Sequence, residues 1–247
     1  MRTRYEKTRA VVLSSRPLGE ADRIVSLFTA SLGRVDAVVK GVRRTKSRWG
    51  GRLEPFGIVD LVLFRGRSLH TVTSAQLVWA PQLVREDREA MTAAALVCEA
   101  AAGLFGEEEE HERVFTLLGR ALREIDQGFD GAALRAPLAL GALMKLLHEA
   151  GYLPVLEQCV VCGSTERPAV GFSAERGGLV CASCAGDGAP ITPAAVAALR
   201  ASVELPLAEL RGGAPSPAVE EAFHHVLRLY GFHTGGRLRA VRFAQQA

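Results

Sequence analysis

The chain has 247 residues, 48% of them hydrophobic, which is enough apolar material for one large domain or two smaller ones. No apolar run reaches the ~18 residues that a membrane-spanning helix needs. The charged start of the chain, residues 1–7, leads into no signal-like segment. We therefore expect a cytoplasmic protein without membrane contact.

The net charge of +3 conceals an uneven distribution along the chain. Residues 1–80 hold 15 Lys and Arg against 6 Asp and Glu, a net +9, whereas residues 81–247 hold 15 against 21, a net −6. A basic segment beside an acidic one indicates an anionic partner for the first. A basic surface that is only solvated would have the same composition.

Before residue 80, short apolar and β-branched runs are separated by Gly, Pro and charged residues. The predicted strands are Arg9–Ser15, Arg23–Thr29, Arg34–Lys40, Ile58–Phe64 and Leu69–Ser74. Five strands in about 75 residues predict a small closed barrel, and a five-stranded oligonucleotide-binding (OB) barrel has the right size. An SH3-like barrel or a small open sheet fits the pattern nearly as well.

The segment between the third and fourth strands, residues 40–52, is the densest cluster of positive charge. It has six cations, no acid and no apolar period, so it is predicted to be an exposed loop. Such a loop suits a phosphate backbone, and Trp49 is placed to stack on an unpaired base. The alternatives are a solvated loop and a Trp49 that covers the barrel core. The predicted nucleic-acid contacts are Lys40, Arg43, Arg44, Lys46, Arg48, Trp49 and Arg52, extended by Arg65 and Arg67 on a separate turn.

No enzyme signature is found. The chain has no GxxxxGK[ST] phosphate loop, no HExxH zinc-protease motif and no H-x-E before its cysteines. Glu20 and Asp22 are too few for a metal-dependent nuclease, which needs several convergent carboxylates, and we expect them to pair with Arg16 or Arg23. No catalytic residue is predicted, and the protein is expected to be non-enzymatic.

After Pro81 the apolar period becomes helical. One predicted helix buries the face Val114, Phe115, Leu118, Leu122 and Ile125. Residues 134–150 are apolar on most sides, which predicts a central buried helix that stops at Gly151.

Two later helices are expected to begin at Thr192-Pro193 and Ser216-Pro217, each with an N-cap residue and a first-turn proline. The second is expected to end at Gly231. The predicted fold class is α+β, with an OB-fold barrel over residues 1–80. An α-helical domain follows over residues 81–247, with an inserted four-cysteine zinc finger at about 155–188.

Four of the five cysteines form two CxxC pairs, Cys159 with Cys162 and Cys181 with Cys184. The 18 residues between the pairs fall within the spacing of four-cysteine zinc sites, because two CxxC turns can complete a tetrahedron of thiolates. Four thiolates leave no position for a catalytic water, so the zinc is expected to be structural. A redox CxxC would need a thioredoxin-like setting that is absent, and two disulfides would disagree with a cytoplasmic location. The fifth, Cys98, is expected to be a small buried hydrophobe.

The chain resembles the RecO family of bacterial recombination mediators over nearly its whole length. The segments that carry the resemblance, in chain order, are 16–29, 40–48, 53–56, 151–154, 159–163, Phe172, 177–178 and 181–184. The most specific part lies between Arg16 and Phe56. After residue 190 the chain shares the helical character of the family but none of its specific motifs.

The resemblance implies an N-terminal OB fold and a helical domain with a zinc-finger insert. It also implies binding to single- and double-stranded DNA, annealing of complementary strands, and cooperation with RecR to load RecA onto DNA covered by single-stranded-DNA-binding protein (SSB). The family's SSB contact lies in the helical domain, and a nucleoid-associated location follows. From charge and cysteine spacing alone, a zinc-ribbon RNA-binding or transcription-associated protein would be almost as well supported. A metalloenzyme such as a nuclease lacks the carboxylates.

Overall fold

The computed structural model describes residues 4–44, 47, 49–67, 69–107, 109–186 and 188–245, with side chains up to residue 242. The chain forms two compact units. The barrel unit comprises Met1–Gln82 and Phe105–Arg123, and the helical unit comprises Leu83–Leu104 and Glu124–Ala247. Among the described helices, none has both the length and the apolar character to span a membrane.

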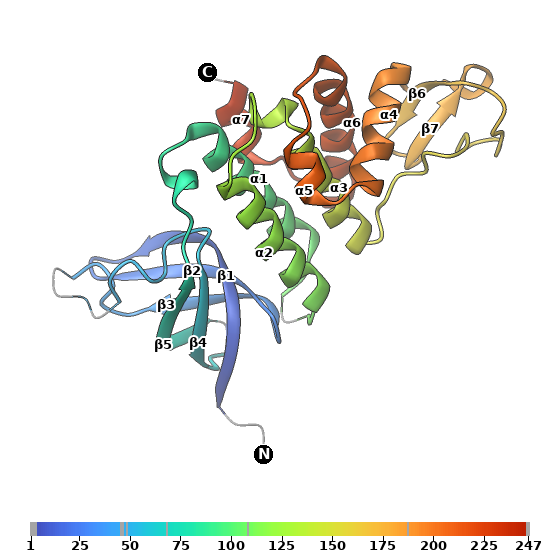
Figure 1. The fold of residues 1–247 in the computed structure, drawn as a ribbon. Helices are drawn as coiled ribbons and strands as arrows, with labels where there is room; N and C mark the ends of the chain where they lie inside the picture. The colour runs from blue at the N-terminus through green and yellow to red at the C-terminus, as the bar shows by residue number, and fades with distance from the viewer. Residues whose placement is uncertain are drawn as a thin grey trace. The chain divides into compact units, whose positions relative to one another are not determined.

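Five strands make up a closed barrel in the order β1-β2-β3-β5-β4, with β4 pairing back onto β1 (Figure 1). Neighbouring strands are antiparallel except β3 and β5, which are parallel. This topology confirms the predicted five-stranded barrel. The strands are β1 (Tyr5–Leu18), β2 (Asp22–Thr29), β3 (Gly33–Val39), β4 (Ile58–Phe64) and β5 (His70–Trp79).

Alternating side chains of these strands fill the barrel. In β3, Val35, Ala37 and Val39 are buried while the residues between them are partly exposed, as the two-residue period of a strand requires. Val25 and Leu27 of β2 join them in one hydrophobic cluster.

Helix α2 (Glu112–Asp126) has the predicted apolar face, with Val114, Leu118, Leu122 and Ile125 buried and Phe115 half-buried. Its residues up to Arg123 belong to the barrel unit, although they lie after the predicted boundary at residue 80. The Arg123 guanidinium lies 5.5 Å from the centre of the Trp79 ring.

The helical unit is arranged around α3 (Pro137–Glu149), which is buried on almost every side, as predicted. It contacts α1, α4, α5 and α6. The remaining elements are η1 (Leu83–Arg85), α1 (Arg88–Leu104), η2 (Ala133–Arg135), α4 (Pro193–Glu204), α5 (Leu207–Arg211), α6 (Pro217–Thr234) and α7 (Arg239–Gln245).

Both predicted N-caps are present. Thr192 Oγ1 accepts a hydrogen bond from the Ala195 N–H, and Ser216 Oγ accepts one from the Val219 N–H, each at 3.2 Å. The prediction that the last of these helices ends at Gly231 is wrong. Helix α6 continues to Thr234 and is capped by Gly235, whose φ of 65° lies in the left-handed region that favours glycine.

The insert that contains the cysteine pairs has a small sheet, which begins after Cys162 and includes Cys181 at the end of its second strand. Strands β6 (Ala169–Ser173), β7 (Gly178–Cys181) and β8 (Ala189–Pro190) form an antiparallel sheet in the order β7-β6-β8, and η3 (Ala182–Cys184) follows β7. Gly178 bridges to Val155, and a Cβ at this glycine would collide with the Val155 carbonyl. Because only glycine fits there, the start of the insert can pair closely with β7.

The packing of α2 makes a testable prediction. Leu118→Ala empties a fully buried position of the barrel unit and should cost about 2–5 kcal/mol of its stability. Trp49 and Trp79 are the two tryptophans of the chain and both belong to the barrel unit, so urea unfolding followed by tryptophan fluorescence reports on this unit. Arg120→Ala, on the exposed face of α2, is the matched control and should change stability by less than about 0.5 kcal/mol. An equal effect of both variants would contradict the assignment of α2 to the barrel unit.

Candidate nucleic-acid interface and metal centre

The basic loop leaves the barrel directly after β3. Lys40 is exposed, and the next residue, Gly41, has a φ of 69° and donates its N–H to Asp22 Oδ1 at 2.7 Å. The carboxylate of Asp22 therefore fixes the start of the loop. The predicted pairing of Asp22 with a neighbouring arginine is wrong, since the partner of Arg23 is Glu54, at 3.4 Å.

Trp49 anchors the middle of the loop in the barrel core. It is only 3% exposed, belongs to the same hydrophobic cluster as β2 and β3, and donates its indole N–H to the Lys40 carbonyl at 2.8 Å. A ring that is buried and hydrogen-bonded in this way is not available to an unpaired base. The predicted stacking role of Trp49 is wrong, and its indole instead holds the two arms of the loop together.

The cations around this anchor face solvent. Arg43 donates from its backbone N–H to the Ala21 carbonyl and from Nη1 to the Gly19 carbonyl, both at 2.9 Å. These bonds place the basic loop against the turn between β1 and β2. The exposed members of the predicted set are Lys40, Arg43, Arg44 and Arg52, while Lys46 and Arg48 lie outside the described residues.

The loop returns to the barrel through Leu53 and Phe56. Leu53 is buried in the core cluster, and the Phe56 N–H donates to the Val12 carbonyl at 2.7 Å. Phe56 has a φ of 71°, which costs a non-glycine residue about 1 kcal/mol or more. Both ends of the loop are thus fixed to strands, and the exposed cations among its described residues are Lys40, Arg43, Arg44 and Arg52.

Arg65 and Arg67 do not join this cluster. They follow β4, where the Arg65 N–H donates to the Arg4 carbonyl at 2.8 Å, next to the start of β1. The basic loop lies beside the other end of β1, 13 residues along the strand, which is a path of roughly 40 Å. Arg65 is half-buried and paired with Glu6 at 3.3 Å, whereas Arg67 is exposed.

The four cysteines of the two CxxC pairs meet at one point of the insert. Their Sγ atoms all lie within 4.8 Å of one another, and those of Cys162 and Cys181 are 3.8 Å apart. Gly163, with a φ of 70°, closes the first turn by donating its N–H to the Cys159 carbonyl at 2.9 Å. Cys98 is buried away from this cluster in α1, and burial raises the pKa of its thiol.

The electrostatics of the cluster suit a cation. The backbone N–H groups of Cys162 and Cys181 donate to Cys159 Sγ and lower the pKa of that thiol to about 6. The neighbouring Cys162 sulfur, together with burial, raises the pKa of Cys184 to about 12. Four sulfurs this close can all be thiolates only if a positive ion compensates their repulsion, and four thiolates are the preferred set of structural zinc. The residues present therefore fit such a metal.

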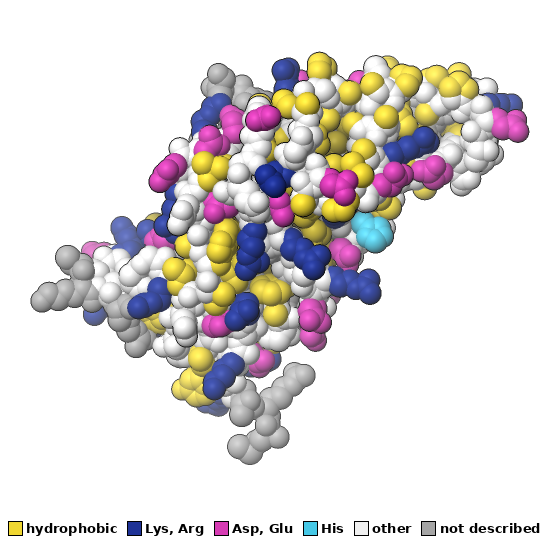
Figure 2. All heavy atoms as spheres, in the orientation of Figure 1, with side chains coloured by type: hydrophobic (Ala, Val, Ile, Leu, Met, Phe, Trp, Pro, Cys, Tyr) yellow, Lys and Arg dark blue, Asp and Glu magenta, His cyan; other side chains and the backbone are white. Residues whose placement is uncertain are grey.

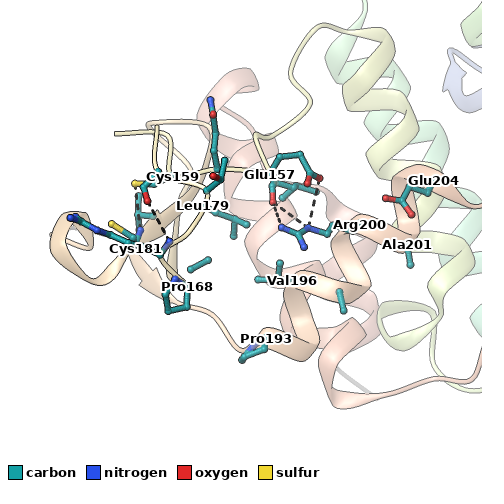
Figure 3. Close-up of a pocket in the computed structure, with 18 of the residues that line it drawn as sticks. Glu157, Cys159, Pro168, Leu179, Cys181, Pro193, Val196, Arg200, Ala201 and Glu204 are labelled. Carbon is teal, nitrogen blue, oxygen red and sulfur yellow. Dashed lines mark hydrogen bonds and ion pairs between the residues drawn. The ribbon is translucent and has the colours of Figure 1, made fainter. Parts of the chain in front are cut away.

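Helix α4 holds the insert through Arg200. Its Nε and Nη2 donate to the Leu156 carbonyl at 3.2 and 2.6 Å, and the guanidinium also pairs with Glu157 at 3.7 Å. A pocket of about 540 Å³ lies between α4 and the insert, with Cys159 and Cys181 in its wall (Figure 3). The sequence separation between Arg200 and Leu156 explains why no local pattern indicates this contact.

The anchoring of the loop by Asp22 can be tested by proteolysis. Asp22→Ala leaves the Gly41 N–H without its carboxylate, which should cost about 1–3 kcal/mol of loop stability. Trypsin should then cut after Lys40, Arg43 or Arg44 faster than in the wild type, as measured by mass spectrometry of timed digests. Glu20→Ala removes an exposed acid from the same turn and serves as the control. Equal cleavage rates in the two variants would show that Asp22 does not hold the loop.

Sequence comparisons agree with this architecture. The family model "Recombination protein O N terminal" matches residues 1–80, and "Recombination protein O C terminal" matches residues 85–242. The chain is similar to the DNA repair protein RecO of Rubrobacter xylanophilus, with 36% identity over 91% of this chain and 90% of the relative. It is also similar to that of Bifidobacterium adolescentis, with 38% identity over 94% and 96%. The chain therefore belongs to the RecO family of DNA repair proteins.

Proposed function

We propose that this protein is a non-enzymatic recombination mediator that binds single- and double-stranded DNA through its barrel unit and anneals complementary strands. The observation that carries the proposal is the group of exposed cations, Lys40, Arg43, Arg44 and Arg52, on a loop that Arg43 holds against the β1–β2 turn. In OB barrels this turn is one of the loops that contact oligonucleotides. Phosphate contacts from such a group position a strand without selecting its sequence.

The mechanism follows from charge. Two nucleic-acid strands repel each other through their phosphates, and cations on a fixed loop offset that repulsion while both strands are bound. Base pairing then supplies the driving free energy, so no bond chemistry is required of the protein. We further propose that RecR and SSB are its partners, the latter through the helical unit. Together with RecR the protein would help to load RecA onto SSB-covered single strands, in the cytoplasm at the nucleoid.

We also propose that Cys159, Cys162, Cys181 and Cys184 hold one structural zinc per chain. The metal would supply folding free energy to a three-stranded sheet whose own hydrophobic cluster is small and is made largely of the cysteines themselves. The hydrogen bond from Arg200 to the Leu156 carbonyl would fix α4 to the insert that the metal stabilises. In this proposal the metal stabilises the helical unit and takes no part in DNA contact.

Strand annealing in the presence of SSB tests the main proposal. A Lys40→Ala/Arg43→Ala/Arg44→Ala protein should anneal much more slowly than the wild type, because three phosphate contacts are lost. Its affinity for single-stranded DNA should also depend less on salt, with the slope of log K against log salt reduced by about 2. The control is Arg85→Ala/Arg113→Ala/Arg120→Ala, which removes the same charge at exposed positions outside the loop.

An unchanged slope and annealing rate in the loop variant would refute the loop as the DNA contact. A wild type that prefers structured RNA over single-stranded DNA in competition would favour an RNA-binding protein. Magnesium-dependent cleavage of DNA would refute the non-enzymatic proposal.

The zinc proposal is tested by native mass spectrometry. The wild type should carry one zinc per chain and should lose it as the pH falls, because protons compete with the metal for the thiolates. Cys159→Ser should abolish stoichiometric zinc, and Cys98→Ala, at the buried cysteine outside the cluster, should retain it. Wild-type protein without zinc, or a Cys159→Ser protein that keeps it, would end the assignment.

A further inference from the structure

The basic loop does not by itself explain how the barrel unit would recognise a single strand. Cations recognise phosphates, which single and double strands share, whereas recognition of a single strand also uses aromatic rings on which unpaired bases stack. Trp49 is buried and cannot serve. Among the described residues of the barrel unit, Tyr5 is the one aromatic residue that is more than half exposed, at 58%.

Tyr5 lies on a defined site at the start of β1. It is paired with Phe64 of β4 across the sheet, and the two rings meet edge-on, with centroids 5.3 Å apart and planes at 64°. An edge-on contact of this kind is favourable and orients the ring. It covers only part of Tyr5, as the exposure of this residue shows, so an oriented aromatic surface remains open to solvent.

Basic residues lie next to the pair in the sequence. Lys7 lies two residues after Tyr5 and therefore on the same outer face of β1, and Arg4 and Arg67 flank the two rings along the chain. The two acids nearby already have partners: Glu6 pairs with Arg65, and Asp60 with Arg9. Within the described part of the chain, Arg4, Lys7 and Arg67 have no acidic partner. Figure 2 shows hydrophobic side chains beside Lys and Arg side chains at the end of the barrel where β1 begins.

The outer face of the sheet continues this site. A shallow hollow of about 410 Å³ runs over β1, β4 and β5, with Lys7, Val62 and Ser74 among the residues that line it. Val62 is the cross-strand neighbour of Lys7, and Ser74 is that of Val62. An extended chain that places one base on Tyr5 would thus meet a cation and a hydroxyl at the next positions along the sheet.

We propose that Tyr5, supported by Phe64 and flanked by Arg4, Lys7 and Arg67, is a second contact for single-stranded DNA, where an unpaired base stacks on the Tyr5 ring. This inference rests on the proposed function. The site lies at the opposite end of β1 from the basic loop, so one barrel has two separate contacts for nucleic acid. The aromatic contact distinguishes a single strand from a duplex, in which the bases are already stacked on each other.

The test uses the full-length protein and a fluorescein-labelled oligo(dT), with affinity measured by anisotropy over a series of salt concentrations. Tyr5→Leu keeps an apolar side chain against Phe64 but removes the aromatic face, and it should weaken binding by about 5- to 100-fold. Because stacking releases no counterions, the plot of log K against log salt should shift downwards without a change of slope. Tyr5→Phe keeps the ring and should bind like the wild type.

Two controls separate this contact from other effects. Leu77→Ala shortens another exposed apolar side chain of the barrel, 41% exposed on β5, and should leave oligo(dT) affinity unchanged. Affinity for a blunt duplex should fall little in Tyr5→Leu, since a duplex offers no unpaired base. Thermal unfolding of each variant, followed by tryptophan fluorescence, checks that the barrel is intact.

The outcomes are distinct. Wild-type affinity in Tyr5→Leu, or an equal loss for duplex and oligo(dT), would overturn the stacking site while leaving the basic loop and the proposed function in place. A changed slope of log K against log salt, without a downward shift of the plot, would also overturn it. In that case Tyr5 would affect binding through the phosphate contacts of the cations and not through stacking. If the wild type bound no single-stranded DNA, the proposed function and this inference would both fail.

Discussion

The basic loop of the barrel depends on one buried indole. Its cations cannot stabilise one another, since two positive charges about 7 Å apart near a protein surface repel by about 2 kcal/mol. Burying a side chain as large as that of Trp49 contributes about 3–5 kcal/mol, enough to offset one or two such repulsions. The hydrogen bond from the indole to the Lys40 carbonyl fixes the orientation of the buried ring. The indole thereby holds a densely charged segment against the barrel.

The two units are stabilised in different ways. The barrel unit presents positive charge and must hold it in a defined shape, which it does with a closed sheet and a buried aromatic ring. The helical unit has its own core around α3 and carries a small sheet with only a small hydrophobic cluster, formed by Val180 with Cys159 and Cys181. The four thiols gathered within 4.8 Å include both cysteines of that cluster, and Arg200 on α4 holds the insert from outside. This division explains why the cysteines and the dense cluster of cations lie in different parts of the chain.

Much of this architecture could be predicted from the sequence, because it depends on local patterns. Short apolar and β-branched runs between turn residues located all five strands, although β5 continues to Trp79, five residues beyond its predicted end at Ser74. The CxxC spacing identified the cysteine cluster. β1 was predicted to start at Arg9 because its first residues, from Tyr5 on, are polar or exposed and carry no alternation of apolar side chains. Helix α1 escaped prediction because its many alanines produce no clear apolar stripe.

The errors have a common cause, which is that tertiary contacts decided the outcome. Whether Trp49 stacks on a ligand or fills a core depends on strands far from it in sequence. Arg65 was predicted to extend the nucleic-acid contacts, yet it pairs with Glu6, which lies 59 residues away in the sequence. Helix α6 continues for another turn beyond Gly231, so its C-cap is Gly235. Family resemblance supplied what composition and spacing alone did not, namely the distinction between a recombination protein and another basic protein with two CxxC pairs.

The barrel unit is discontinuous in sequence, and this has a consequence for its synthesis. Its second segment, Phe105–Arg123, follows α1, which belongs to the other unit. At about 5–20 residues per second, a ribosome needs about 2–8 s to extend the chain from residue 82 to residue 123. For about the first 1–5 s of that time, until residue 107 is made, Phe28 lacks its ring contact with Phe105 and Arg34 lacks its ion pair with Glu107. The nascent barrel therefore passes through a stage with uncovered apolar surface, in which it is open to chaperones or to aggregation before the rest of the protein exists.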